Sequence, residues 1–374
     1  MAGDNRRDFI KGSAAASALL ILKPELARAY QTNSALSVGL LGAGRRGTYV
    51  SGIFAKNEFC KVAAICDIYD DQLAAAAKLF SGARQFKDAH ELLASDVDAV
   101  YIATPPYLHP EHFEAAVKAR KHIFMEKPAG VDPVGCKRVL EAAKKADPTK
   151  RISVDYQQRY GRDYRAAHDI LKSGRLGPIK MIRASWLGGG LPVRSGHPDD
   201  QEKVRNWLFY RERSGDIIVE QDCHNLDVVN WFMESHPTKV YGFGGRAVRK
   251  DIGNIMDNLA VTFEFADGTV FSYAANQFSN QNYHDVGETF LCDRGVISTS
   301  RGGYKVYDKS KGEPDVVTTD YDITRDAVNE FIEGARTGKV ENAAFYAVES
   351  TLTAIMAREA ILSGKEKTWK DVQV

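Results

Sequence analysis

Residues 36–47 read LSVGLLGAGRRG, and this stretch decides the first half of the fold. A short apolar run leads directly into three glycines with the spacing Gly42-x-Gly44-x-x-Gly47. Gly42 permits a tight turn, Gly44 lets a ligand approach the backbone, and Gly47 lets a helix pack closely on the strand. The free N–H groups at the start of that helix favour a pyrophosphate. The stretch therefore predicts a strand, a dinucleotide-binding turn and a helix.

An acidic residue further along the chain indicates which dinucleotide the turn would bind. The next apolar run ends at Asp67, 20 residues after Gly47. A carboxylate at this spacing can accept hydrogen bonds from the ribose hydroxyls and would repel a 2′-phosphate, which favours NAD over NADP. Arg45 and Arg46 keep NADP open as an alternative, because either guanidinium could bind a phosphate.

Strand and helix patterns then alternate as far as about residue 156. They cover residues 70–80, 98–106, 109–120, 121–128, 132–146 and 151–156. Such alternation predicts a parallel, doubly wound sheet. Ligands of these sheets bind beyond the carboxyl ends of the strands. Three polar or turn clusters lie at predicted strand ends: Thr104-Pro105-Pro106, Glu126-Lys127-Pro128 and Asp155-Tyr156-Gln157.

The pattern changes in the second half, where several strands follow one another without helices between them. These strand patterns lie within residues 238–246, 259–278, 288–299 and 304–308, and Asp267-Gly268 is a typical hairpin turn. Consecutive strands predict a largely antiparallel sheet. We therefore expect an α/β protein with a dinucleotide-binding domain over 30–156 and a second α/β domain over 157–374, built on a large, mostly antiparallel open sheet.

The N-terminus has the order of an export signal. Arg6 and Arg7 precede an uncharged run of 11 residues, 12–22, and Ala27-Arg28-Ala29 fits a small-x-small cleavage site. The stretch NRRDFIK resembles a twin-arginine signal, with Asn5 where Ser or Thr is more usual. A disordered basic N-terminus is the alternative. Twin-arginine systems carry folded proteins, so the resemblance implies a cofactor loaded before export and a periplasmic or other extracytoplasmic location.

Composition limits the possible partners. The signal holds five Lys and Arg and three acidic residues, so its removal takes the net charge from +1 to about −1. This balance gives no indication of nucleic acid or an anionic membrane as a partner. No later apolar run is long enough to cross a bilayer. The five cysteines are scattered and form no CxxC pair, which disfavours a disulfide framework or a zinc site.

The motifs together resemble those of the Gfo/Idh/MocA oxidoreductases, the family of glucose–fructose oxidoreductase and inositol dehydrogenase. The resemblance is carried by GAGRRG (42–47), Asp67, TPPYLH (104–109), Glu126-Lys127-Pro128 and DYQQRY (155–160). It implies a Rossmann domain whose cofactor contacts include Thr104, Pro105, His109 and Glu126. It also places Lys127 at the nicotinamide and the substrate hydroxyl. Family members use the open sheet face to form dimers or tetramers, whereas a covered sheet in a monomer is the alternative.

One apolar stretch of the second half, 214–234, carries polar residues at helical spacing. Glu220, His224 and Asp227 are at positions i, i+4 and i+7, and fall within an arc of about 60° on one helix face. The residues alone leave two interpretations open, a solvent-exposed face or a polar stripe facing a site. The resemblance favours the site, because family members carry an acid-x-x-x-His pair facing the nicotinamide. The acid there is usually Asp.

These residues suggest a division of catalytic roles. His224 has the pKa range of a general base, which would take the hydroxyl proton of the substrate. The Lys127 ammonium would stabilise a developing alkoxide, and we expect burial beside a charged nicotinamide to lower its pKa. Glu220 would orient the imidazole or bind a neighbouring sugar hydroxyl. A metal site is disfavoured, because His224 and Glu220 are only two ligands.

Aromatic and polar residues near the predicted site are candidates for a sugar pocket. Aromatic faces pack on sugar C–H groups, and Arg donates to hydroxyls. The candidates are Tyr156, Arg159, Trp186, Trp207 and Asp227. Each could instead belong to the core. The glycine-rich loop 187–200 is expected to help to select the substrate.

The sequence thus predicts an NAD-dependent dehydrogenase of a sugar or glycoside, with a tightly bound cofactor that is regenerated in place. Two alternatives use the same fold. One is an NAD-dependent glycosidase that oxidises C3 transiently and eliminates the aglycone. The other is a non-catalytic sugar- or NAD-binding protein, in which Lys127 and His224 are structural.

Overall fold

A parallel six-stranded sheet forms the first half of the protein, with strand order β3-β2-β1-β4-β5-β6. Its strands are β1 (Leu36–Leu41), β2 (Cys60–Cys66), β3 (Arg84–Phe86), β4 (Ala99–Ile102), β5 (His122–Met125) and β6 (Ile152–Val154). This order is that of a doubly wound Rossmann sheet, which confirms the predicted fold class. The computed structural model describes residues 35–280 and 282–374, so the predicted export signal lies outside the described residues.

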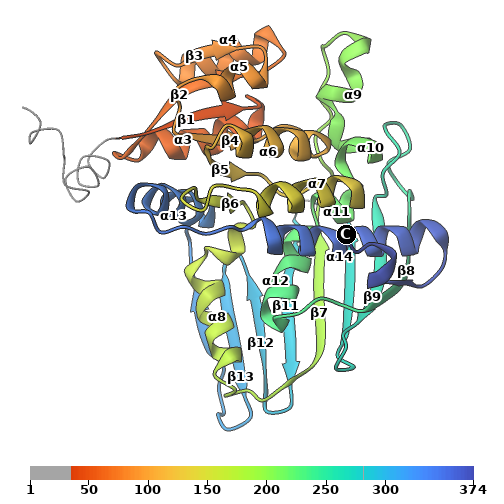
Figure 1. Cartoon of the computed structure of the whole chain (residues 1–374). Coiled ribbons are helices and arrows are strands. Elements are labelled where there is room, and N and C mark those ends of the chain that lie inside the picture. Colours follow the sequence, from red (N-terminus) through yellow and green to blue (C-terminus); the bar gives the residue numbers. More distant parts are fainter. Residues whose placement is uncertain (1–34, 281) are drawn as a thin grey trace, which may run out of the picture.

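Helices on both faces of this sheet connect its strands (Figure 1). They are α3 (Arg45–Lys56), α4 (Asp70–Leu79), α5 (Ala89–Ala94), α6 (His109–Lys118) and α7 (Pro133–Lys144). Local chemistry sets two of their starts. The Asp88 carboxylate accepts the N–H groups of His90 and Glu91, and Asp132 accepts that of Gly135. The strand order reverses between β1 and β4, which places a ligand crevice at the carboxyl ends of these strands.

The second sheet has nine strands in the order β14-β13-β12-β11-β7-β10-β9-β8-β15. Its strands are β7 (Ile179–Leu187), β8 (Lys239–Gly245), β9 (Asn258–Glu264), β10 (Val270–Asn276), β11 (Asp285–Cys292), β12 (Gly295–Ser300), β13 (Gly303–Asp308), β14 (Asp315–Thr318) and β15 (Lys367–Thr368). All neighbouring strands are antiparallel except β7 and β10. The predicted hairpin at Asp267-Gly268 joins β9 to β10, with Gly268 at a φ of 84°.

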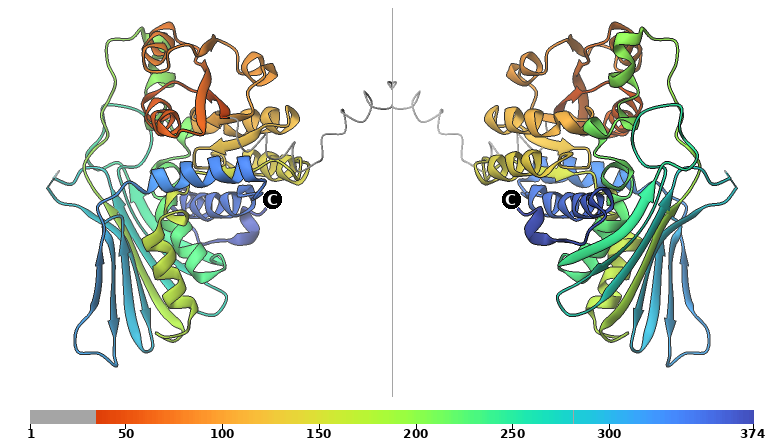
Figure 2. Two further views of the ribbon diagram at one scale, coloured as in Figure 1. Left: turned by 90° about the vertical axis from the view of Figure 1, so that its left-hand side faces the viewer. Right: turned by 90° about the vertical axis from the view of Figure 1, so that its right-hand side faces the viewer.

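Helices cover one face of the second sheet and leave the other open, as Figure 2 shows. The covering helices are α8 (Arg162–Lys172), α12 (Cys223–Met233) and α14 (Ala344–Ser363). The opposite face carries exposed aromatic residues, among them Tyr241 and Phe243. Among the described residues, every helix is too short or too polar to cross a membrane.

The chain returns to the first sheet after the second is complete. Helix α13 (Ile323–Thr337) packs on α3 and β1, although it falls within 157–374, the range predicted for the second domain. Its Phe331 is wholly buried, with ring centroids 5.9 Å from Phe54 and 5.4 Å from Phe124. Helix α14 then packs against both α7 and β8. Helix α13 therefore belongs to the first sheet, and α14 links that domain to the second sheet.

Replacing Phe331 by Ala should lower the free energy of unfolding by about 3–5 kcal/mol, because it leaves a cavity between α13 and the first sheet. Urea unfolding of the variant measures this loss. Phe345→Ala is the matched control, since Phe345 is 45% exposed on α14; its effect should stay within about 0.5 kcal/mol. Equal losses in the two variants would contradict the assigned packing of α13.

Candidate active site

The glycine turn after β1 forms the floor of a groove of about 340 Å³. Gly42 has a φ of 91°, and a Cβ atom there would lie 2.6 Å from the carbonyl oxygen of Ala103. A Cβ at Gly47 would lie 2.0 Å from the carbonyl oxygen of Gly42, so neither site accepts a side chain. A Cβ at Gly44 would meet no atom within 4 Å. No side chain of the described residues caps α3, so this turn fits the phosphates of a dinucleotide.

Asp67 lies at the end of β2 and lines the same groove. Its Oδ2 accepts the N–H of Ala43 at 2.9 Å, and its Oδ1 accepts that of Tyr69 at 3.0 Å. Burial raises the pKa of this carboxyl group. The two backbone bonds fix the carboxylate, and each oxygen retains a lone pair for a ribose hydroxyl.

The two arginines of GAGRRG, Arg45 and Arg46, have different surroundings. Arg45 is exposed and does not line the groove. The Nε of Arg46 donates to Glu126 at 2.8 Å, and its Nη2 donates to Asp155. Burial and the Glu126 charge raise the pKa of Asp155 to about 7. Two buried carboxylates therefore already bind the Arg46 guanidinium, which removes one of the two cations on which the NADP alternative rested.

A second cavity, of about 320 Å³, adjoins the groove. Ala103, Thr104 and Trp207 line both spaces. Six further residues predicted for the site also line one of them, namely Pro105, His109, Glu126, Lys127, Glu220 and His224. Folding thus brings together groups from strand-end turns of the first sheet and from the stretch 214–234 of the second half.

Lys127 forms an ion pair across this cavity. Its Nζ donates to Oε1 of Glu220 at 2.8 Å and also to the Glu220 carbonyl oxygen. Burial alone would lower the pKa of Lys127, but the Glu220 carboxylate outweighs it and raises that pKa. Our expectation of a lowered pKa concerned Lys127 beside a charged nicotinamide and stays a prediction; the ion pair with Glu220, which sequence spacing did not reveal, acts in the opposite direction. Lys127 is a protonated ammonium at neutral pH.

His224 is 6% exposed, and its ring stacks on Trp186 with the centroids 6.0 Å apart. Burial, followed by the positive charges of Lys127 and Arg301, lowers the pKa of His224 well below its usual value. Its Nδ1 has no hydrogen-bond partner among the described residues. Glu220 binds Lys127 and leaves the imidazole to be positioned by Trp186. His224 is therefore neutral at physiological pH and able to accept a proton.

The stretch 214–234 is divided into two helices, whereas we expected one. Helix α11 (Ile217–Glu220) ends at Glu220, and α12 begins at Cys223. The N–H groups of both Gln221 and Asp222 bond to the carbonyl oxygen of Ile217, so the hydrogen-bond register slips by one residue. Such π-type slips change which side chains share a face. Glu220 and His224 reach the cavity, and Asp227 does not.

Asp227, Arg159 and Tyr156 lie in the interior beside the cavity without lining it. The Nε and Nη2 of Arg159 donate to Asp227 at 2.8–3.0 Å. The Ser350 hydroxyl donates to the same carboxylate at 2.7 Å. Tyr156 is wholly buried, with its hydroxyl 3.2 Å from that of Thr351. Of the five predicted sugar-pocket residues, these three pack beside the cavity, and Trp186 and Trp207 line it.

Other residues complete the cavity wall. They are Gln157, Leu191, Gln221 and Arg301. Arg301 lies in the turn between β12 and β13, with its Cζ 5.3 Å from the Trp186 ring centroid. No local pattern marks Arg301, because its approach to Trp186 and His224 depends on how the whole second sheet folds. Within residues 35–280 and 282–374, no three His, Cys, Asp or Glu side chains are arranged to hold a metal ion.

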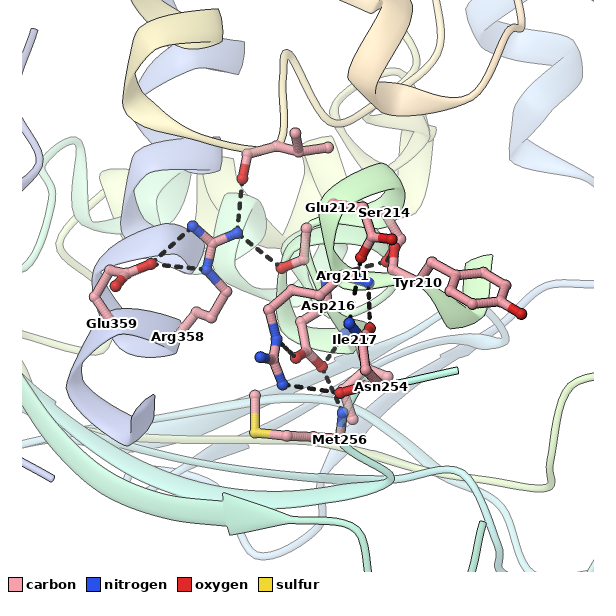
Figure 3. A network of polar contacts seen from close by, with 12 residues as sticks. Tyr210, Arg211, Glu212, Ser214, Asp216, Ile217, Asn254, Met256, Arg358 and Glu359 are labelled. Carbon is pink, nitrogen blue, oxygen red and sulfur yellow. Dashed lines mark hydrogen bonds and ion pairs between the residues drawn. The ribbon is translucent and has the colours of Figure 1, made fainter. Parts of the chain in front are cut away.

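A buried polar network fixes the two turns that bring Lys127 and Glu220 together (Figure 3). The Nη1 of Arg358, on α14, donates to the carbonyl oxygens of Val131 at 2.6 Å and Gly215 at 3.1 Å. Val131 lies four residues after Lys127, and Gly215 lies five residues before Glu220. One guanidinium therefore joins the chain segments that carry the ion pair.

Asp216 sets the start of α11 in the same network (Figure 3). Its backbone has a φ of 81°, which is unfavourable for a residue with a side chain. Its carboxylate offsets this cost by accepting from the N–H groups of Ile217 and Met256 and from the Nε of Arg211, each at 2.8 Å. The direction of α11, and with it the place of Glu220, follows from these bonds.

Known proteins share this architecture. The chain is 25% identical over 238 residues to the myo-inositol 2-dehydrogenase of Thermotoga maritima, a match that covers 63% of this chain and 66% of that one. It is 28% identical over 233 residues to the inositol 2-dehydrogenase of Rhizobium meliloti, covering 62% and 65%. The matched region thus spans about two thirds of the length of these relatives.

Solved structures show the same fold. A levoglucosan dehydrogenase in complex with NADH superposes with a TM-score of 0.79 at 19% identity, over 91% of this chain and all of that one. The apo scyllo-inositol dehydrogenase of Lactobacillus casei gives 0.72 at 18% identity, over 90% and 99%.

Family models match both halves of the protein. Residues 36–156 match the oxidoreductase family with an NAD-binding Rossmann fold, and residues 164–302 match the GFO/IDH/MocA C-terminal domain. Together the two matches cover more than half of the chain, and the resemblance inferred from its motifs is confirmed. The chain belongs to the Gfo/Idh/MocA oxidoreductase family.

Proposed function

We propose that the protein is an NAD-dependent dehydrogenase that oxidises one hydroxyl-bearing carbon of a sugar, glycoside or cyclic polyol. The observation that carries this proposal is the meeting of Lys127, Glu220 and His224 in a cavity that adjoins the dinucleotide groove. Related proteins named inositol 2-dehydrogenases and a structural neighbour named levoglucosan dehydrogenase support the class of substrate.

The residues of the cavity divide the proton chemistry between them. A nicotinamide dinucleotide, when bound, supplies the acceptor for the hydride of the substrate carbon. The neutral imidazole of His224 takes the hydroxyl proton. The Lys127 ammonium stabilises the negative charge that develops on the substrate oxygen. Glu220 keeps Lys127 protonated and aimed into the cavity, since the two are 2.8 Å apart.

The cavity wall suits a compact, polyhydroxylated ring. Its volume of about 320 Å³ is at the lower end of the range for small-molecule sites. Trp186 and Trp207 offer aromatic surfaces to C–H groups of the ring. Arg301 donates to hydroxyls, while Gln157 and Gln221 both donate and accept.

The cofactor and the location follow from features outside this cavity. Asp67 in the groove favours NAD over NADP. The sequence pattern of residues 1–29 supports export by the twin-arginine route to the periplasm. A cofactor exported in this way stays tightly bound and is regenerated in place. The open face of the second sheet supports a homodimer or homotetramer.

The function is tested on protein lacking residues 1–29. Denaturation should release a stoichiometric amount of NAD or NADH, which an enzymatic assay measures. The intact protein is then given inositols, monosaccharides and a nitrophenyl glycoside without added NAD. A rise in absorbance at 340 nm without phenol release supports the dehydrogenase, whereas nitrophenol release supports the glycosidase alternative. A protein that neither contains nor binds a nucleotide would contradict both.

Lys127→Met should reduce turnover by about 10²–10³-fold, because the developing alkoxide loses its electrostatic partner. Nucleotide content should stay at the wild-type level. Lys118→Met is the matched control, since Lys118 is exposed on α6. Wild-type turnover in Lys127→Met would show that the role assigned to the ammonium is wrong.

Glu220→Gln should move the alkaline limb of the kcat/KM profile to lower pH by about one unit or more. The Glu220 charge raises the pKa of Lys127 against the effect of burial. Without that charge, burial dominates, and the ammonium loses its proton at a lower pH. Profiles between pH 6 and 11 measure the shift. Glu234→Gln is the control, because Glu234 forms an exposed ion pair with Lys172, and it should leave the alkaline limb in place. An alkaline limb that moves in neither variant would contradict the coupling between Glu220 and Lys127.

Replacing Arg6 and Arg7 together by Lys should retain the full-length protein in the cytoplasm, because twin-arginine export depends on both guanidinium groups. Immunoblots of periplasmic and cytoplasmic fractions measure the distribution. The retained protein should contain as much nucleotide as the exported one. Unchanged export of the variant would exclude the twin-arginine route.

A further inference from the structure

A segment of the second half reaches over the ribose end of the dinucleotide groove. It includes the short helix α9 (Glu202–Arg205), which stands beside the first domain in Figure 1. The Nη1 and Nη2 of Arg205 donate to the two oxygens of Asp71, at the start of α4, at 2.8 Å each. The Arg205 side chain is 13% exposed. The contact is thus a bidentate ion pair between the two halves of the protein.

The same guanidinium covers an aromatic ring of the groove. The Cζ of Arg205 lies 4.0 Å from the ring centroid of Tyr69, within cation–π range. The N–H of Tyr69 in turn donates to Asp67, the predicted ribose acceptor. Arg205, Tyr69 and Asp67 all line the groove, together with Arg194 and Trp207. The ion pair therefore lies at the wall of the ribose-binding end.

Hydrogen bonds within the segment hold its two ends together. Asn206 accepts the N–H of Arg194 and donates to its carbonyl oxygen, both at 2.9 Å. The Asn206 amide also donates to Glu202 at 3.0 Å, and His197 lies 2.7 Å from the same carboxylate. These bonds close residues 194–206 into a loop that presents Arg205 to the first domain. We call this loop the clasp.

We propose that the clasp closes over the ribose end of the bound dinucleotide, with the Arg205–Asp71 ion pair as its latch. Arg205 is thereby a cofactor-binding residue contributed by the second half of the chain. This inference rests on the proposed function, because it requires a dinucleotide in the groove. Arg205 and Tyr69 line the groove together with Asp67, so we expect a ligand held at Asp67 to leave past them once the latch has opened. The clasp thus slows cofactor loss.

The test is the rate at which NADH leaves the holoenzyme. Wild-type protein and the variants Arg205→Ala and Asp71→Asn are loaded with NADH and mixed with excess NAD, and the fall in NADH fluorescence is followed. Each variant should release NADH about fivefold faster than the wild type. A fivefold change is the upper end of the effect expected from one ion pair of this exposure. The double variant should be no faster than either single one, because the two residues share one interaction.

Two further variants separate a latch from a general loss of stability. The charge-exchanged protein, Arg205→Asp with Asp71→Arg, should restore slow release. Arg138→Ala removes a comparable two-bond ion pair with Glu114 on the surface of the first domain and should leave release unchanged. The Tm of the nucleotide-free variants is measured in parallel, because a purely structural tie would lower Tm without changing the release rate.

The outcomes distinguish this inference from the proposed function. Wild-type release rates in Arg205→Ala and Asp71→Asn would overturn the clasp while leaving the dehydrogenase proposal intact. A wild-type protein that binds no NADH would overturn both. Faster release in both single variants, with recovery in the charge-exchanged protein, establishes the latch.

Discussion

The ion pair between Lys127 and Glu220 joins the two halves of the protein at the point where they share a cavity. Lys127 lies two residues after β5 of the parallel sheet, and Glu220 ends a short helix of the second half. Each group alone would be a buried charge with a large desolvation cost, and together they satisfy one another. The protonation of the lysine and the charge around His224 both depend on this contact.

Much of the first domain follows from local rules. The glycine turn at 42–47, Asp67 and the cluster at Lys127 each stand where a buried strand ends, and parallel strands collect their carboxyl ends at one edge. Folding of the sheet alone is enough to bring these groups together. The spacing of His224 and Glu220 left a solvent-exposed face and a site open, and the family resemblance favoured the site. The antiparallel character of the second sheet likewise follows from its uninterrupted strand patterns.

The remaining features arise from contacts between distant segments. Helical spacing places Asp227 on the face of Glu220 and His224, but the slip at Asp222 rotates Glu220 relative to α12, and the Asp227 carboxylate binds Arg159 outside the cavity. Nothing in the amino-acid sequence around Asp222 marks this slip of the hydrogen-bond register. Arg301 comes from a hairpin turn whose place is set by the second sheet as a whole. The return of α13 to the first sheet similarly depends on an aromatic contact between residues far apart in the chain.

The way in which Arg358 holds the site has a consequence for how the protein tolerates sequence change. Its guanidinium binds the carbonyl oxygens of residues 131 and 215, and every amino acid carries such an oxygen. The side chain at position 131 can therefore diverge while the link persists, whereas position 215 is restricted to glycine by its φ of 83° and by Val219, which a Cβ atom would approach to 2.7 Å. The side chain that this link requires is that of one arginine on α14. The surrounding loops can therefore change in sequence to suit different substrates.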